Sequence, residues 1–349
     1  MKSEVRSQKK KAFLDEGKAF HFGSRLHPSS FRLSFHPSPF TLHPFIFLLL
    51  AFACVPASAS AASARVAVLD FGETEAGRAA AARVAASLGS VSRPGASAQD
   101  EWFAFVDRDL ARAAARGAGY AGSLNMTLRE ARDLGAAIDC DFFIVGDTQT
   151  IRRSSSEAAA YFESYASVFV VSARTGRLVA WDRPSVEAPA PEESAARLLL
   201  LLDSLTRTHY APAIREARER EARERGESLA REDADFYEDL SGAGDAATPG
   251  DVRAPEPFRR LRPAYPDTAA RAEAEATVDV LVSIGADGEV RSVEVARWAG
   301  FGLDESVVRT VRQMHFRPAT RGGTPFASRV LLRYNFRRPP KPNPPARQK

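Results

Sequence analysis

A glycine pattern near the middle of the chain is the first candidate for chemistry. Gly117, Gly119 and Gly122 have the G-x-G-x-x-G spacing with which dinucleotide-binding folds bring backbone N–H groups close to a pyrophosphate. That chemistry requires the glycines to follow a strand and to open a helix, whereas here they follow an alanine-rich stretch typical of a helix. We therefore expect residues 117–122 to be a loop, and we expect no nucleotide cofactor.

The histidines, cysteines and carboxylates also lack a catalytic or metal-binding pattern in the sequence. No Cys or His pair has metal-ligand spacing, and His209 and His315 are the only histidines after residue 43. His315 precedes an apolar Phe and is predicted to be a partly exposed strand residue. Asp70 and Asp107 end apolar strands, where ligands often bind in α/β folds, but helix capping accounts for both carboxylates. We expect no enzyme activity, no cofactor, no metal and no small-molecule substrate.

The chain has a formal net charge of +4, and its excess of basic residues is confined to the two ends. Residues 1–43 hold eight Lys or Arg against three acids, and the segment after Phe336 adds five more basic residues and no acid. The body between them is therefore acidic, whereas a nucleic-acid binder carries its basic charge on the folded domain. We expect no nucleic-acid partner, and we expect the basic, proline-rich residues 338–349 to be a solvated tail.

The only strongly apolar segment is PFIFLLLAFACV at residues 44–55. Its twelve residues are too few for a membrane-spanning helix, which needs about 20, and the small residues after it offer A-x-A cleavage sites. We therefore assign residues 1–64 to a presequence with a secretory signal and expect a periplasmic protein. Two alternatives stay open: lipidation of Cys54, which would make an outer-membrane lipoprotein, and an uncleaved signal that anchors the chain in the inner membrane.

Residues 65–210 show the apolar patterns of an α/β domain. Thr127 and Glu130 form a capping-box pattern that opens one of its helices, and Cys140 is predicted to be an inert core residue. The order β-α-β-α-α-β-β-β-α predicts an α/β sandwich with a mixed sheet between helices. The predicted strands are 65–71, 102–107, 141–150, 161–173 and 178–182, and the predicted helices are 76–88, 107–116, 127–137 and 192–205.

Several segments of this domain carry a resemblance to known envelope proteins: RVAVLDF, FAFVDRDL, LGAAIDCDFFIVGDTQT and VFVVSARTGRLVAW. With these segments the domain resembles the amino-terminal domain of the TolB translocation protein, and the CsgG and penicillin-binding-protein-activator lipoproteins. The resemblance implies an envelope location and protein–protein contacts, and it carries no catalytic residues.

Residues 211–257 differ in composition from the segments on either side. The motif EARER occurs twice in tandem, at 216–220 and 221–225, and its Glu and Arg residues have the i, i+4 spacing of a solvent-exposed helix. Residues 242–257 are rich in Gly, Ala and Pro, which predicts a flexible linker. We therefore expect two independently folded domains with few contacts between them.

Residues 258–337 combine strand and helix patterns in the order ββαβ. Alternating segments at 277–284 and 289–298 flank Asp287-Gly288, a pair that supplies the positive φ of a tight hairpin. A final strand is predicted at 327–336, with an unpaired edge that can template an added strand. The intervening helix, at 303–314, has on one face Leu303, Val307, Val308, Val311 and Met314.

The residues of this segment are similar to the TonB carboxy-terminal domain almost end to end. The matching features are Tyr265-Pro266, the Asp-Gly hairpin, Gly300 with Leu303-Asp304, Phe316-x-Pro318-Ala319 and the closing strand. One departure is Met314, which stands where the family commonly has Trp.

The TonB resemblance implies a partner and a site. In the family this domain grips an extended segment of an outer-membrane receptor, which pairs with the final strand beside the Tyr-Pro motif, a mode known as β-augmentation. Energy-coupled members of the family also contact inner-membrane motor proteins. The implied partner-binding residues are Tyr265, Pro266, Ser328, Val330, Leu332 and Tyr334.

Two functions remain open at this point. The first is a TonB-family periplasmic protein that binds an outer-membrane receptor segment or another envelope partner by strand addition, with TonB-dependent transport as its setting. The second is an envelope assembly or activator lipoprotein in which the TonB-like module is a scaffold.

Overall fold

The computed structural model describes residues 63–91, 103–154, 160–230, 237–242 and 251–338. The apolar segment 44–55 with Cys54, and nearly all of the basic tail, lie outside the described residues. The described residues from 63 to 338 belong to one compact unit. Within the described ranges, no helix combines the length and the apolar character that a membrane crossing requires.

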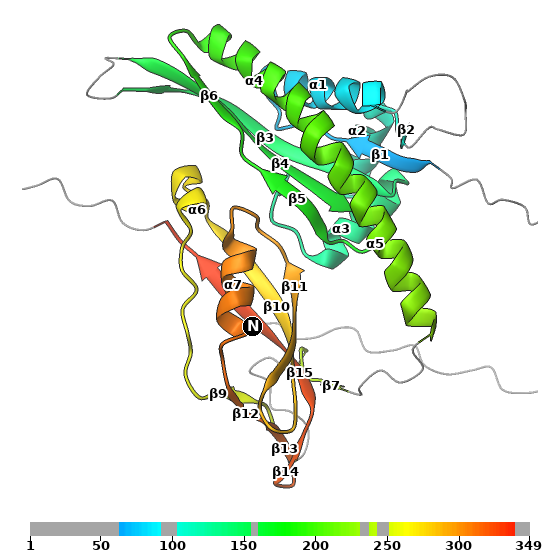
Figure 1. Ribbon diagram of the computed structural model, residues 1–349, viewed down its shortest axis with the longest axis vertical. Coiled ribbons are helices and arrows are strands. Elements are labelled where there is room, and N and C mark those ends of the chain that lie inside the picture. Colours follow the sequence, from blue (N-terminus) through cyan, green and yellow to red (C-terminus); the bar gives the residue numbers. More distant parts are fainter. Residues whose placement is uncertain (1–62, 92–102, 155–159, 231–236, 243–250, 339–349) are drawn as a thin grey trace, which may run out of the picture. The chain divides into compact units, whose positions relative to one another are not determined.

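The first half of this unit is built on one mixed sheet with the strand order β2-β1-β3-β4-β5, and β6 also pairs with β4 (Figure 1). Strands β1, β2 and β3 are parallel, and β4 runs antiparallel to β3, β5 and β6. The predicted α/β fold with a mixed sheet is confirmed. The strands are β1 (Ala64–Val68), β2 (Phe103–Phe105), β3 (Phe142–Arg153), β4 (Tyr161–Ser172), β5 (Leu178–Asp182) and β6 (Ser185–Ala188).

Helices cover both faces of this sheet, and the side chains of each strand alternate between the two resulting cores. Val66 and Val68 of β1 enter one core with α1, α4 and α5, whereas Ala67 enters a second core with α2 and α3. The helices are α1 (Glu75–Val91), α2 (Arg108–Gly117), α3 (Leu128–Ile138), α4 (Pro191–Leu205), the π-helical turn η2 (Thr206–Tyr210) and α5 (Ala211–Ala230).

Two of the three helix caps expected from the sequence are present in the structure. Thr127 and Glu130 form the predicted capping box of α3, and the Asp107 carboxylate caps α2 by accepting from two backbone N–H groups at 3.0 Å. Asp70 was expected to be a cap as well, but its carboxylate pairs with Arg108 at 2.8 Å and with Arg112 at 2.9 Å. Gly117 is the last residue of α2, and the rest of the expected loop, 118–122, follows it, so the glycine pattern lacks the strand-to-helix setting of a phosphate site.

Helix α5 begins inside the α/β domain, although its charged sequence predicted a solvent-exposed spacer. Ile214 and Ala217 are buried in the first core, and Glu221 further along the helix forms an ion pair with Arg174 at 2.9 Å. The first turns of the helix therefore contribute to the domain that precedes them.

The second half of the unit contains a four-stranded sheet with the order β11-β10-β15-β7, and α7 packs on β10 and β11 (Figure 1). This arrangement confirms the predicted ββαβ core. Gly288 in the hairpin has a φ of +84°, as the Asp-Gly pair predicted. The elements are β7 (Glu238–Asp239), α6 (Asp267–Ala272), β10 (Ala276–Ile284), β11 (Val290–Arg297), α7 (Leu303–Val311) and β15 (Ser328–Phe336).

Short strands at the end of this domain include part of the segment that we expected to be a flexible linker. β8 (Val252–Arg253) pairs with β13 (Ala319–Arg321), and β9 (Glu256–Pro257) pairs with β12 (Phe316–Arg317). Strand β13 also forms a hairpin with β14 (Thr324–Phe326). The second half of the expected linker therefore belongs to the folded domain, and residues 243–250 lie outside the described part.

The loop after β11 inserts a tryptophan into the α/β domain. Trp298 is 1 % exposed and belongs to the second core of that domain. Its ring stacks on Phe169 with the ring centres 5.7 Å apart, and its indole N–H donates to the carbonyl of Gly176 at 3.1 Å. The expectation of few contacts between the domains is therefore wrong.

Asn125 ties the same two regions together through the backbone. Its amide nitrogen donates to the carbonyls of Thr277 at 2.9 Å and Trp298 at 2.6 Å, and its side-chain oxygen accepts from the Thr277 N–H at 3.1 Å. Since one side chain satisfies three backbone groups at the start of β10 and the end of β11, it fixes the TonB-like sheet against the α/β domain.

We expect Trp298→Ala to lower the free energy of unfolding of the full chain by roughly 3–5 kcal/mol, the usual cost of truncating a buried aromatic side chain. Because the indole joins two cores, the variant should also unfold in two calorimetric transitions, and the unmodified chain in one. A variant that unfolds like the unmodified protein would show that the insertion does not couple the domains.

Candidate peptide-binding edge

Strand β15 has one fully paired side and one side that is mostly open. All nine of its residues pair with β10 in an unbroken antiparallel register. On the other side, β7 pairs only with Ser328 and Arg329. Among the described residues, no strand pairs with the outer edge of residues 330–336. This part of β15 is therefore available for an added strand.

The hydrogen bonds with β7 show which backbone groups face the open edge. The N–H of Leu240 donates to the carbonyl of Arg329 at 2.8 Å, and the N–H of Glu238 donates to the carbonyl of Ala327 at 3.1 Å. Backbone polar groups alternate between the two sides of a strand. The same side therefore presents the N–H and C=O groups of Leu331, Arg333 and Asn335.

The predicted site residues of β15 are the even-numbered ones, which do not face the open edge. Their backbone groups face β10, and their side chains point to the domain core: Ser328 and Val330 are buried, and Leu332 and Tyr334 pack against the core. The structure thus brings these four side chains to one face of the sheet, while the odd-numbered residues present the edge. Sequence alternation identified the strand but could not assign its phase.

Tyr265 and Pro266 lie at the far end of β15 from β7. The Tyr265 ring is 6.2 Å from that of Phe336, and its hydroxyl donates to the carbonyl of Ala274 at 2.7 Å. Pro266 occupies the N-cap position of α6. Tyr265 thus packs with Phe336 against the core of the domain at that end of the strand.

The side chains of the odd-numbered residues of β15 lie on the face of the sheet that points away from the core. Arg333 forms two hydrogen bonds, at 2.7 and 3.0 Å, with the carboxylate of Asp279, which is 3 % exposed. Leu331 is 36 % exposed and offers an apolar contact between Arg329 and Arg333. A partner strand would meet this mixed surface with its own side chains.

A buried carboxylate, that of Asp304, holds the backbone of the loop that carries Trp298. The two oxygens of Asp304 accept from the backbone N–H groups of Ala299 and Gly300, each at 2.9 Å. Burial raises the pKa of Asp304 to about 7, although the two N–H donors favour the ionised form.

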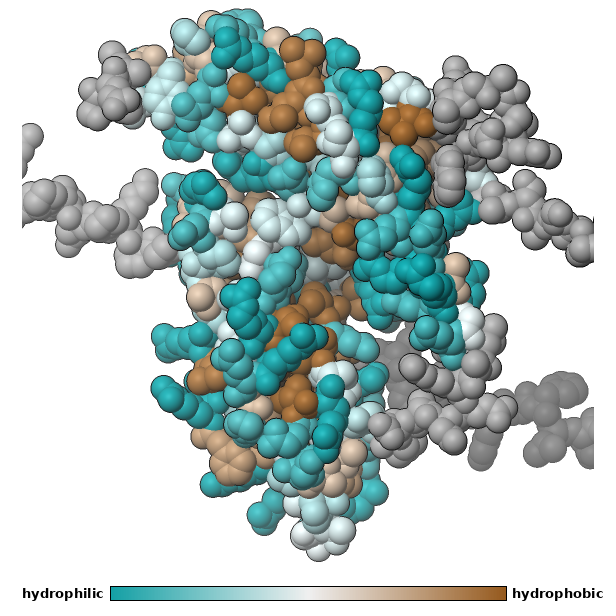
Figure 2. Space-filling view, viewed as in Figure 1, coloured by the Kyte–Doolittle hydropathy of each residue, from teal (hydrophilic) through white to brown (hydrophobic). Residues whose placement is uncertain are grey.

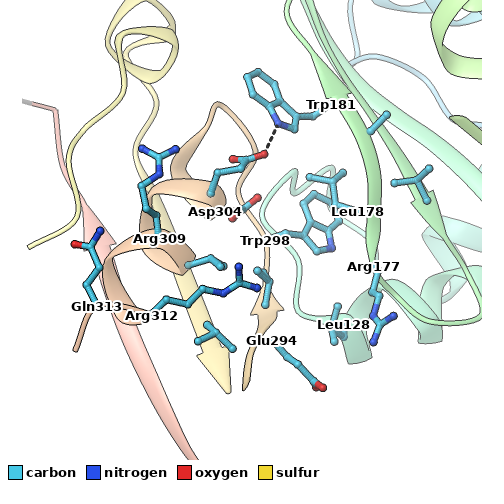
Figure 3. A pocket seen from close by; sticks show the side chains of 16 residues that line it. Leu128, Arg177, Leu178, Trp181, Glu294, Trp298, Asp304, Arg309, Arg312 and Gln313 are labelled. Atoms are coloured by element: carbon cyan, nitrogen blue, oxygen red, sulfur yellow. Dashed lines mark hydrogen bonds between the residues drawn. The ribbon is translucent and has the colours of Figure 1, made fainter. Parts of the chain in front are cut away.

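A groove of about 800 Å³ lies between β5 on one side and β11 with α7 on the other (Figure 3). β5 and β11 are edge strands of their sheets. Trp181 donates its indole N–H to Glu305 at 3.4 Å across the groove, and Arg309 of α7 and Arg312, which follows α7, also line it (Figure 3). Apolar surface gathers near the centre of the molecular face in Figure 2, bordered by hydrophilic residues. This groove is a second surface to be distinguished from β15 in binding experiments.

The remaining reactive groups are accounted for by local contacts. His315, predicted to be partly exposed, has a 65 % exposed side chain and contacts Glu289 at 3.0 Å. Burial raises the pKa of Cys140 to about 12. Within the described ranges, no group of three or more His, Cys, Asp or Glu residues is placed to hold a metal ion.

Comparisons with known proteins bear on the second domain most directly. Residues 262–337 match the family model of the Gram-negative bacterial TonB protein C-terminal region. These residues form a TonB C-terminal domain. The chain is also similar to the TonB C-terminal domain of Pseudomonas aeruginosa solved in solution, with 26 % identity over 25 % of this chain and 86 % of that one, at a TM-score of 0.21. The family match thus identifies residues 262–337, and not the chain as a whole, as TonB-related.

Two further solved structures share about 43 % of this chain. One is a lipoprotein of Neisseria meningitidis, with 13 % identity, 99 % of that chain covered and a TM-score of 0.29. The other is a PelC dodecamer of Paraburkholderia phytofirmans, with 13 % identity, 87 % of that chain covered and a TM-score of 0.25. No curated protein matches this chain.

Asp304 predicts a pH dependence of stability. Its folded pKa of about 7 lies above its ordinary value of 3.8, so the folded state binds this proton more tightly than the unfolded state. The resulting stabilisation is complete below pH 3.8 and is lost as the pH rises through about 7. Asp304→Asn cannot titrate, so the free energy of unfolding of the unmodified chain minus that of the variant should fall between these pH values. Urea unfolding of both proteins across this range measures the difference, and a constant difference would contradict the prediction.

Proposed function

We propose that this protein binds an extended segment of an outer-membrane receptor, or of another envelope protein, as an added strand along β15. The observation that carries the proposal is the one-sided pairing of residues 330–336 within a TonB C-terminal domain. TonB-dependent transport is the setting that this domain favours. The α/β domain would hold a second envelope partner.

Strand addition suits this edge because it uses backbone groups that the domain leaves open. Each added hydrogen bond contributes about 0.5–1.5 kcal/mol, so affinity grows with the length of the paired segment. Backbone pairing is indifferent to sequence, and selectivity then comes from side-chain contacts such as those of Leu331 and Arg329. The open stretch beyond β7 has room for several such bonds.

The proposal includes export to the periplasm, supported by the apolar segment 44–55 and the A-x-A sites after it. We expect a mature amino terminus between Ala57 and Arg65, measured by amino-terminal sequencing of the native protein. A diacylglyceryl Cys54 would contradict this expectation and favour the assembly or activator lipoprotein. Retention of residues 1–54 would also contradict it and favour an inner-membrane anchor with motor proteins as partners.

Leu331→Pro should weaken peptide binding and leave the fold intact. Proline deletes one N–H that faces the open edge, and proline is tolerated where the N–H of an edge strand faces outward. With a peptide from the periplasmic amino terminus of an outer-membrane receptor of the same organism, we expect an affinity loss of about 1 kcal/mol or more. Titration calorimetry of the full chain measures the loss.

Leu331→Ala is the matched control, because it removes the same side chain and keeps the N–H. Hydrogen exchange should show protection of residues 330–336 when the peptide binds. Equal losses in the two variants, or protection of β5 and β11 around the groove in place of β15, would contradict the proposed edge. Failure of every receptor peptide to bind would favour the scaffold function.

A further inference from the structure

A segment of the chain itself occupies one end of the proposed binding edge. Strand β7 pairs with β15 in parallel, with Glu238 opposite Ser328 and Asp239 opposite Arg329. The two backbone N–H donors of this segment, at Glu238 and Leu240, use the carbonyls of Ala327 and Arg329. This is the geometry of strand addition, formed here by an internal segment that is not connected to β15 by a hairpin.

Two side chains of the segment Glu238–Leu240 anchor it to the domain. The Glu238 carboxylate accepts two hydrogen bonds, at 2.6 and 2.8 Å, from the Arg321 guanidinium of β13. Two residues later, Leu240 is 8 % exposed and belongs to the hydrophobic core of the TonB domain. Asp239, between them, is exposed, and its carboxylate accepts from the Ser241 N–H at 2.8 Å within the same segment. The segment therefore has a contact face of one carboxylate and one aliphatic side chain, and an exposed face on which Asp239 bonds within the segment itself.

We infer that Glu238–Leu240 is an internal competitor for the partner's place at the start of β15. The inference rests on the proposed function in taking β15 as the edge that the partner uses. It adds that a partner covering the full edge runs parallel to β15 and displaces this segment. It also adds the chemistry that such a partner supplies at that end: a carboxylate for Arg321, then an aliphatic side chain two residues later.

The competitor is short, and it is tethered. A two-residue ladder contributes few hydrogen bonds, so a longer strand that also pairs with residues 331–335 can replace it. Because the segment is part of the same chain, its effective concentration at the edge is high. A competing peptide finds the edge free in only a fraction of the molecules, and its apparent affinity is reduced by that fraction. Short or poorly matched peptides therefore fail to displace the segment.

Leu240→Ala in the full chain tests the inference. The probe is a labelled peptide with the sequence of residues 236–242, FYEDLSG, measured by fluorescence anisotropy. Because the truncated side chain frees the edge, we expect the variant to bind the probe roughly tenfold more tightly than the unmodified chain does. Glu238→Gln, which removes the charge that faces Arg321, should act in the same direction. In both variants the bound probe should protect residues 327–331 from hydrogen exchange.

Asp239→Asn is the matched control, because it removes a charge on the exposed face of the same strand and keeps an oxygen that can accept from the Ser241 N–H, so it should leave probe affinity nearly unchanged. Equal affinity of the unmodified chain, Leu240→Ala and Glu238→Gln for the probe would overturn the inference, as would protection away from β15. If a receptor peptide protects β15 but gains no affinity in Leu240→Ala, the inference fails and the proposed function stands. If the probe binds the freed edge and no receptor peptide binds any variant, the proposed function fails and self-occupation of the edge stands.

Discussion

A strand at the edge of a sheet leaves every second backbone N–H and C=O without a partner, and β15 is such a strand over most of its length. Burial of these groups requires hydrogen bonds, so the edge either stays in water or accepts another strand. Strand β10 pairs with β15 along one side, and helix α7 covers one face of β10 and β11. The TonB C-terminal domain is in this sense an incomplete sheet, and its proposed function follows from that incompleteness.

The incomplete sheet is attached to the larger α/β domain. Asp304 binds the backbone of the loop after β11, the loop carries Trp298, and Trp298 fills a core of the α/β domain. Asn125 completes the junction by pairing with the backbone at the start of β10 and the end of β11. A buried tryptophan and an amide with three hydrogen bonds therefore join the second domain to the α/β domain.

The position of β7 explains why the chain between the domains is more than a spacer. The segment after α5 contributes Leu240 to the TonB-domain core, and residues 251–257 pair with β12 and β13. The connection therefore covers the start of β15 and stabilises the end of the domain, while it leaves residues 330–336 open. Control of access to the edge is built into the same stretch of chain that links the two halves.

The sequence by itself determined the longer elements and their order, because period-two and helical patterns, the Thr127 capping box and the Asp287-Gly288 turn act over a few residues. It also located the TonB domain, its final strand and the Tyr265-Pro266 motif. Only the tertiary structure decided which residues of β15 face the open edge, since alternation gives two equivalent phases until a neighbouring strand is seen. The insertion of Trp298 and the docking of Leu240 were likewise invisible in the sequence, because an apolar residue near a loop shows that it will be buried but not which core receives it.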